Sequence, residues 1–207
     1  SVFVFIVVFQ QDIRHGLERI ASSHWIRRSG KADPSAEFIE TIVSTTEILA
    51  EQRVGALLVF PGREPLDPHI RGGVSVDSEI SQPLLLSIFH PKSPGHDGAV
   101  LISEDRISRL GVHLPLTLNL MQLNGGGTRH AAALGLSERC DAMVVVVSEE
   151  QGTIKIAREG ELTSADKAQL AERLRLYFSE LTFANRRPLA NRIQNWTTMS
   201  AAVVIAT

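Results

Sequence analysis

Residues 142–147 read Ala-Met-Val-Val-Val-Val, and this run decides the fold. β-Branched side chains favour extended backbone, and an unbroken apolar run indicates a strand buried on both faces. Gln151-Gly152 predicts a turn, and Thr-Ile-Lys-Ile-Ala at residues 153–157 predicts the second strand of a hairpin. The sequence therefore predicts a central strand with packed layers on either side.

Other apolar segments predict neighbours for this strand. Residues 54–60 (VGALLVF) end at Pro61-Gly62 and predict a second buried strand. Residues 99–102 and 107–112 flank a polar turn and predict another hairpin. We expect a loop over residues 65–74.

Between the predicted strands lie segments whose apolar residues recur at helical spacing, and we expect these segments to be helices. We expect Asp33 or Ser35 to cap the helix at 36–52, and Ser164 to cap the last helix, in which Leu170, Leu174 and Tyr177 share one face. Strands and helices do not alternate strictly, so the predicted fold is α/β (α+β mixed), a single globular domain with a mixed sheet flanked by helices. The expected helices cover residues 12–26, 36–52, 81–89, 129–136 and 164–177.

Length and composition restrict the function classes. The 207 residues suffice for one domain with a substantial core. The net charge of −2 provides no electrostatic basis for nucleic-acid binding. The single cysteine, Cys140, excludes an internal disulfide and fits a reducing compartment.

Both ends of the chain are apolar. Residues 2–9 (VFVFIVVF) and 201–206 are each shorter than the roughly 20 residues that span a bilayer. They are either a buried first strand and a docked tail, or parts of transmembrane helices, which the interfacial residues Arg192 and Trp196 favour. The expected organisation is a membrane segment and helix at 1–33, a catalytic domain at 34–180 and a linker with a second membrane segment at 181–207.

His96-Asp97-Gly98-Ala99 places an acid at the start of a predicted strand. A carboxylate beside a glycine can approach a phosphate and hold a divalent ion, with His96 as a second ligand. The alternative is that Asp97 is a turn acid that accepts backbone N–H bonds.

Gly125-Gly126-Gly127 precedes Thr128-Arg129-His130 and a predicted helix. Backbone N–H groups, a hydroxyl, a helix N-terminus and a guanidinium together suit a phosphate group. The alternative is a flexible loop in which Thr128 is an ordinary N-cap. The spacing matches neither a P-loop nor a Rossmann fingerprint.

Ser148-Glu149-Glu150 follows the central strand at its carboxyl end. Sites tend to form at such ends, and we expect at most one of the two adjacent acids to face a ligand. The alternative is a solvated turn before Gly152.

Three motifs resemble the diadenylate cyclase catalytic domain: HDGAV at 96–100, GTRHAAALGLSE at 127–138 and VVSEEQG at 146–152. The similarity extends from about Val8 to Tyr177 and is greatest to the membrane-anchored branch. The resemblance implies that two ATP molecules condense to cyclic di-AMP and release two pyrophosphates. It also implies a face-to-face homodimer, a divalent ion (Mg²⁺, Mn²⁺ or Co²⁺) and a catalytic domain at the cytoplasmic face of the cell membrane.

The resemblance also assigns roles to residues. Asp97 helps to activate the attacking hydroxyl and binds metal, with His96 and Glu150 as further ligands. The catalytic set is Asp97, Thr128, Arg129 and His130. Phosphate contacts come from Gly127, Thr128, Arg129 and His130, with Ser148 nearby, while Gly98 and Ala99 lie under the nucleotide and Val76, His113 and Leu114 border the adenine.

Two positions depart from the family pattern. Ala131 stands where the family usually has a second basic residue, and His113 stands where tyrosine is common. The resemblance therefore predicts activity, and the missing phosphate contact either lowers it or transfers its role to Arg129. The alternatives are an inactive nucleotide sensor, a membrane-tethered scaffold, and another metal-dependent nucleotidyl transferase or hydrolase.

Overall fold

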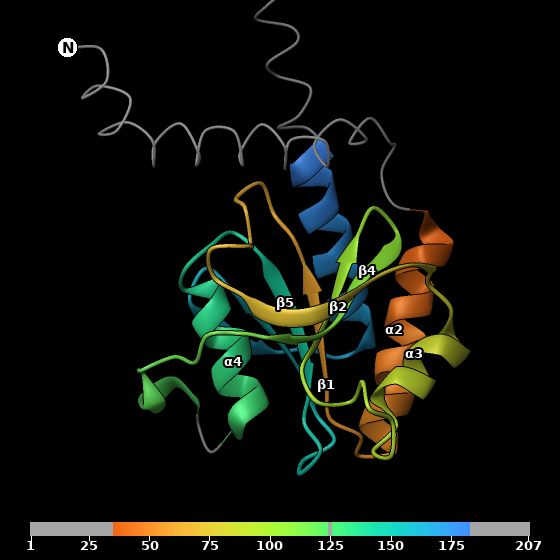
Figure 1. The fold of residues 1–207 in the computed structure, drawn as a ribbon, viewed down its shortest axis with the longest axis horizontal. Coiled ribbons are helices and arrows are strands. Elements are labelled where there is room, and N and C mark those ends of the chain that lie inside the picture. The colour runs from red at the N-terminus through yellow and green to blue at the C-terminus, as the bar shows by residue number, and fades with distance from the viewer. Residues whose placement is uncertain (1–34, 124–125, 183–207) are drawn as a thin grey trace, which may run out of the picture. The chain divides into compact units, whose positions relative to one another are not determined.

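A computed structural model of the chain describes residues 35–123 and 126–182, without the side chains of residues 120 and 122. These residues form a seven-stranded sheet with the order β2-β4-β3-β1-β5-β6-β7 (Figure 1). The strands are β1 Ala56–Phe60, β2 Arg71–Glu79, β3 Ala99–Ser103, β4 Arg106–His113, β5 Met143–Val147, β6 Ile154–Arg158 and β7 Glu161–Ser164.

The sheet is mixed, as predicted. β1 is parallel to β3 and antiparallel to β5. The other strand pairs of the described sheet are antiparallel and include both predicted hairpins, β3–β4 and β5–β6.

β5 is buried on both faces, which confirms the prediction from its valine run. Met143, Val145 and Val147 belong to one hydrophobic cluster, and Val144 and Val146 belong to another on the opposite face. Because successive side chains of a strand point to opposite faces, both clusters need a covering layer.

Helices supply these layers (Figure 1). α2 (Ala36–Glu51), α3 (Gln82–Phe89) and a helix at residues 167–182 contribute to the first cluster. α4 (Thr128–Ser137) contributes Ala132, Ala133 and Leu136 to the second. A short 3-10 helix, η1 (Leu120–Leu123), precedes α4.

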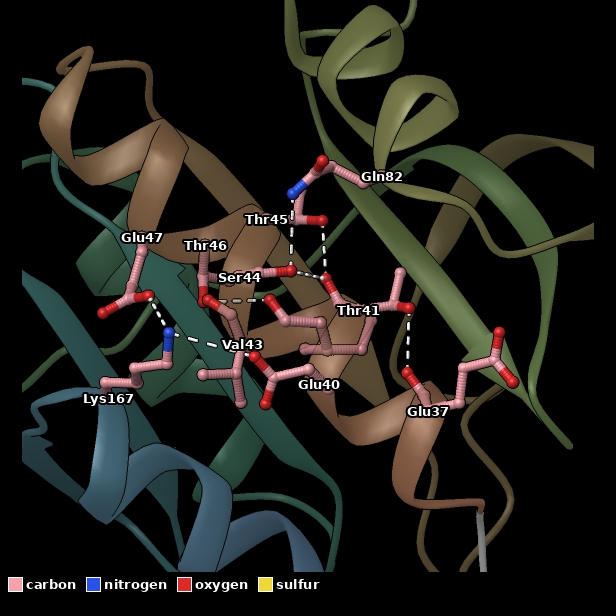
Figure 2. Close-up of polar contacts among 11 residues, drawn as sticks. Glu37, Glu40, Thr41, Val43, Ser44, Thr45, Thr46, Glu47, Gln82 and Lys167 are labelled. Atoms are coloured by element: carbon pink, nitrogen blue, oxygen red, sulfur yellow. Dashed lines mark hydrogen bonds and ion pairs between the residues drawn. The ribbon is translucent and has the colours of Figure 1, made fainter.

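Polar contacts attach α2 to its neighbours (Figure 2). Ser35 caps the helix by accepting a hydrogen bond from the Phe38 N–H at 3.1 Å. Gln82 of α3 donates to the Ser44 hydroxyl at 3.4 Å, and the Lys167 ammonium lies 2.7 Å from the Glu47 carboxylate. α2 is therefore linked both to α3 and to the helix that begins at residue 167.

Two strands were not predicted from the sequence. β2 includes residues 71–74, which we expected to be part of a loop, and β7 was not expected. Most residues of β2 are exposed, and Gly72 and Gly73 have positive φ angles of 66° and 85°. Such a segment lacks apolar alternation, and pairing with β4 makes it a strand.

The predicted cap of the last helix was wrong. Ser164 is the last residue of β7, and the cap is Asp166, whose carboxylate accepts from the Gln169 N–H at 2.8 Å. The Gln169 side chain accepts from the Asp166 N–H at 3.0 Å. This reciprocal pair is a capping box, so the helix starts at residue 167. The shared face of Leu170, Leu174 and Tyr177 is confirmed, because all three are buried.

Several predictions fall outside the described residues: the helix at 12–26, Asp33 as a cap, and the apolar segments at 2–9 and 201–206. Over residues 35–123 and 126–182, no helix has the length and apolar character needed to cross a bilayer.

Candidate active site

The three motifs meet at one edge of the sheet, where β1 and β3 begin and β4 and β5 end. We call it the site edge. Leu58 pairs with Val100, and Ala56 pairs with Val147, so the residues before β3 and after β5 lie on either side of the start of β1. α4 also begins here, because Arg129 in its first turn contacts Glu149, which follows β5.

An ion pair joins two of the motifs directly. Nη1 of Arg129 donates to Oε2 of Glu149 at 2.6 Å. A Cβ atom on Gly55 would lie 2.6 Å from Nη1 and 2.9 Å from Oε2, so the pair rests on the backbone just before β1. Gly55 was not predicted as a site residue; its only signal in the sequence is a glycine near the start of a buried strand.

The backbone itself requires a glycine at position 98. We expected it to leave room for a ligand. Its φ is +111°, and a Cβ atom would lie 2.7 Å from the carbonyl carbon of Gly111 in β4. Gly98 therefore permits the close approach of two backbones, which fixes the position of the preceding Asp97.

Asp97 is exposed, and its carboxylate makes no hydrogen bond or ion pair with any described residue. The turn-acid alternative is therefore not what the structure shows. The adjacent His96 is half-buried, and its Nδ1 lies 2.6 Å from the Ser93 carbonyl oxygen. That contact closes the loop before Asp97 and leaves Nε2 as the ring nitrogen that can bind a ligand.

Thr128 is the first residue of α4 and not its N-cap. The N-cap is Gly127, which has no side chain to satisfy the first N–H groups. The Thr128 hydroxyl is exposed and makes no hydrogen bond within the described part of the chain. The start of α4 thus keeps the features of an anion site: uncapped N–H groups and the positive end of the helix dipole.

His130 is 3% exposed, and its Nε2 has no hydrogen-bond partner among the described residues. Burial lowers the pKa of His130, the positive charge of Lys155 lowers it further, and Glu150 partly opposes both effects. The imidazole is therefore neutral at pH 7. A buried nitrogen without a partner is costly, which is consistent with a ligand group that completes it.

The two acids after β5 both reach the start of α4, and the expectation that at most one of them faces a ligand stays a prediction. Glu149 pairs with Arg129, and an oxygen of Glu150 lies 3.9 Å from the position of a Cβ on Gly127. Ser148 has a structural partner: its hydroxyl accepts from the Gln151 N–H at 3.2 Å and closes the turn.

The predicted adenine contacts divide into two groups. His113 ends β4 at the site edge and is exposed, and the adjacent Leu114 is half-buried. Val76 lies farther along β2 and packs against the cluster under α2 and α3, so the structure does not bring it to the edge. Ala99 is fully buried in the core beneath the edge.

The described residues contain no group of three or more His, Cys, Asp or Glu side chains that could hold a metal ion together. His96, Asp97 and Glu150 therefore do not form a complete ligand set within one chain. Mg²⁺ is usually bound by one or two carboxylates together with substrate phosphates. Asp97 has a free carboxylate at the same edge of the sheet as the start of α4, and such a carboxylate fits a metal that is held in that way.

Comparisons with known proteins show the family. The family model described as "DisA bacterial checkpoint controller nucleotide-binding" matches residues 43–162, which include all three motifs. Cyclic di-AMP synthase CdaA of Bacillus subtilis is 35% identical over 159 residues, which are 76% of this chain and 58% of that protein. The chain thus spans little more than half the length of this curated relative.

Two solved structures show the same fold. A double mutant of DacA from Staphylococcus aureus has a TM-score of 0.66 at 36% identity, over 69% of this chain and 95% of that one. A protein from Bacillus cereus described as a hypothetical membrane spanning protein has a TM-score of 0.61 at 36% identity, over 78% of this chain and 79% of that one. The chain belongs to the family of DisA bacterial checkpoint controller nucleotide-binding domains.

Proposed function

We propose that this chain is a diadenylate cyclase that condenses two ATP molecules into cyclic di-AMP and releases two pyrophosphates. The observation that carries the proposal is the meeting of an unpaired carboxylate, Asp97, and an uncapped helix start, Thr128, at one edge of the sheet. Relatives named cyclic di-AMP synthase or diadenylate cyclase support it.

ATP has matching contacts along the site edge. The adenine lies against His113 and Leu114, where an aromatic and an aliphatic side chain follow each other at the end of β4. The phosphates lie at the start of α4, where Thr128 offers a hydroxyl and Arg129 a guanidinium. The neutral His130 donates from Nε2, and this bond supplies the partner that the nitrogen lacks.

The reaction joins two nucleotides held by two chains that face each other. The 3′-oxygen of one ATP attacks the α-phosphorus of the other, and the bond from that phosphorus to the bridging oxygen breaks, so that pyrophosphate leaves. Asp97 accepts the proton of the attacking hydroxyl, and a second, equivalent step closes the ring. Orientation and charge stabilisation provide most of the rate in such a transfer.

A divalent ion, Mg²⁺, Mn²⁺ or Co²⁺, neutralises negative charge on the phosphates when bound. Asp97 would hold it, with His96 and Glu150 as further donors from the two chains of the dimer. Carboxylate oxygens are preferred ligands of Mg²⁺ and Mn²⁺.

We further propose that the domain works at the cytoplasmic face of the cell membrane, tethered through segments outside the described residues. The apolar runs at 2–9 and 201–206 and the likeness to CdaA and to a protein described as membrane spanning support this location. Expression of the complete natural protein that contains this sequence, fused to a fluorescent protein and followed by membrane fractionation, tests it; recovery of that fusion in the soluble fraction would contradict it.

The activity is tested by incubating the purified chain with ATP and Mn²⁺ or Mg²⁺ and identifying the products by chromatography and mass spectrometry. We expect cyclic di-AMP and pyrophosphate. ATP that stays intact with either ion would contradict the proposal.

A second function, a nucleotide sensor without turnover, is favoured by Ala131. In place of the family's usual basic residue, this alanine packs in a small apolar cluster with Leu123 and Leu134. The sensor predicts ATP binding by calorimetry without pyrophosphate release, whereas the cyclase predicts both.

A further inference from the structure

We propose that Glu149 is a positioning residue, which holds the Arg129 guanidinium in the orientation that meets the triphosphate. The inference rests on the proposed function and extends it to a residue that carries no assigned role. It concerns how this chain prepares its phosphate contact before ATP arrives.

The contact between the two side chains is short and leaves donors free. Nη1 of Arg129 lies 2.6 Å from Oε2 of Glu149, and the Arg129 side chain is 23% exposed against 56% for Glu149. A guanidinium has five N–H donors in a fixed plane. Because Glu149 engages Nη1, donors on Nη2 and Nε stay available for two phosphate oxygens.

The backbone beneath the pair restricts it further. Gly55 is buried, and a Cβ atom there would lie within 3 Å of both Nη1 and Oε2. The guanidinium therefore rests on the chain just before β1 and is held at its side by Glu149. A long side chain fixed in this way loses less conformational freedom when the ligand binds.

Removing the Glu149 carboxylate distinguishes two roles for this residue: positioning Arg129, or only competing with the phosphates for its charge. If Glu149 only neutralised Arg129, its loss would free the guanidinium and strengthen ATP binding, since one negative charge near the phosphates disappears. If Glu149 positions Arg129, its loss weakens ATP binding because the free arginine must be ordered at the cost of side-chain entropy.

The experiment compares Glu149→Ala, Glu149→Gln and the wild type in steady-state kinetics with ATP. Ordering one long side chain costs about 0.5–1.5 kcal/mol, so we expect Glu149→Ala to raise KM for ATP about 2- to 10-fold, with a smaller change in kcat. Glu149→Gln keeps an acceptor oxygen, and we expect it to restore most of the wild-type KM.

Glu180→Ala is the matched control. It removes the carboxylate of another arginine–glutamate pair, Arg158–Glu180, in which the glutamate is also 56% exposed. This pair involves the helix at 167–182 and is not part of the site, so KM for ATP should stay unchanged.

A double-mutant cycle on ATP affinity, measured by calorimetry, distinguishes positioning of Arg129 from a general structural role of Glu149. A general structural role would not make the effect of Glu149 depend on Arg129. In the Arg129→Ala background, removing Glu149 should cost no further affinity. A KM for Glu149→Ala equal to or below that of the wild type, or an equal loss in both backgrounds, would overturn the inference. A wild type that makes no cyclic di-AMP would instead refute the proposed function, and this inference with it.

Discussion

The two ends of β5 differ in whether their polar residues have hydrogen-bond partners within the protein. Before the strand, the Asp141 carboxylate accepts from the N–H groups of Arg63 and Glu64 at 2.8 and 3.0 Å. The buried Tyr177 hydroxyl donates to the Phe60 carbonyl oxygen at 2.9 Å, and Asp141 also offers its carbonyl oxygen at 3.3 Å. We call this region the structural end.

At the other end of β5, the site edge, the polar groups lack such partners. Asp97 and the Thr128 hydroxyl have none within the described residues, and neither does the buried Nε2 of His130. Among the described residues, the other buried side-chain atom without a hydrogen-bond partner is Nε of Arg158, which lies 3.3 Å from the Glu159 carboxylate. The buried and unpartnered Nε2 of His130 supports the proposal that a ligand binds at the site edge. If so, changes at the two ends should separate activity from stability.

The largest expected effect is on activity. Asp97→Asn keeps the size of the side chain and removes its charge and basicity, so we expect cyclic di-AMP formation to fall by a factor of about 10²–10⁴. The midpoint temperature of unfolding should stay unchanged, because no described residue bonds to this carboxylate. Initial rates and calorimetry on the same preparation measure both quantities, and equal turnover in the variant would refute the assignment.

The next effect is on stability. Asp141→Ala leaves two backbone N–H groups without their charged acceptor, and hydrogen bonds to charged groups contribute about 1.5–3 kcal/mol each. We expect the free energy of unfolding to fall by about 2–4 kcal/mol in urea titration. The remaining folded protein should keep the KM of the wild type for ATP; a raised KM would show that the two ends are coupled.

Tyr177→Phe probes the structural end more gently. It removes one buried hydroxyl and keeps the ring, which packs edge-on against Phe178 with the centroids 5.6 Å apart. We expect a loss of about 1–2 kcal/mol in the free energy of unfolding and unchanged turnover. A loss of turnover without a loss of stability would contradict the division between the two ends.

The smallest effect concerns pH. The pKa of His130 is lowered in the folded chain, so above its unfolded pKa of about 6.5 neither state binds this proton and the stability is complete. As the pH falls below that value, the unfolded state takes up the proton first, and stability is lost by at most about 1.4 kcal/mol per pH unit until the folded pKa is crossed. Urea titrations from pH 7.5 to 5 should show a smaller fall for His130→Gln; equal slopes would place the pH dependence elsewhere.

The sequence predicted the elements whose signal is local. The valine run of β5 and the apolar segment of β1 each predict a strand that is covered on both faces. The structure confirms both strands and their burial. β2 was missed because its exposed residues become a strand only through pairing with β4. Asp166 and Gln169, which form the capping box, are three residues apart in the sequence. Ser164 was an equally good candidate for the N-cap, so the local sequence did not distinguish them.

The site was predicted as a set of motifs but not as a geometry. Resemblance assigned roles to Asp97, Thr128 and Arg129, and the register of the sheet brings their motifs together. The contact of Arg129 with Glu149 over Gly55 depends on three segments distant in the sequence, so no local pattern contains it. Val76, which resemblance assigned to the adenine, packs against the cluster under α2 and α3, and its contact with the adenine stays a prediction.

The most direct test compares Asp97→Asn and Tyr177→Phe in one experiment, with cyclic di-AMP quantified by mass spectrometry and unfolding followed on the same samples. The account predicts that the wild type and Tyr177→Phe form cyclic di-AMP from ATP and Mn²⁺, while Asp97→Asn, with unchanged stability, forms almost none. Equal product from Asp97→Asn, or none from the folded wild type, would contradict the claim that the site edge is the catalytic centre.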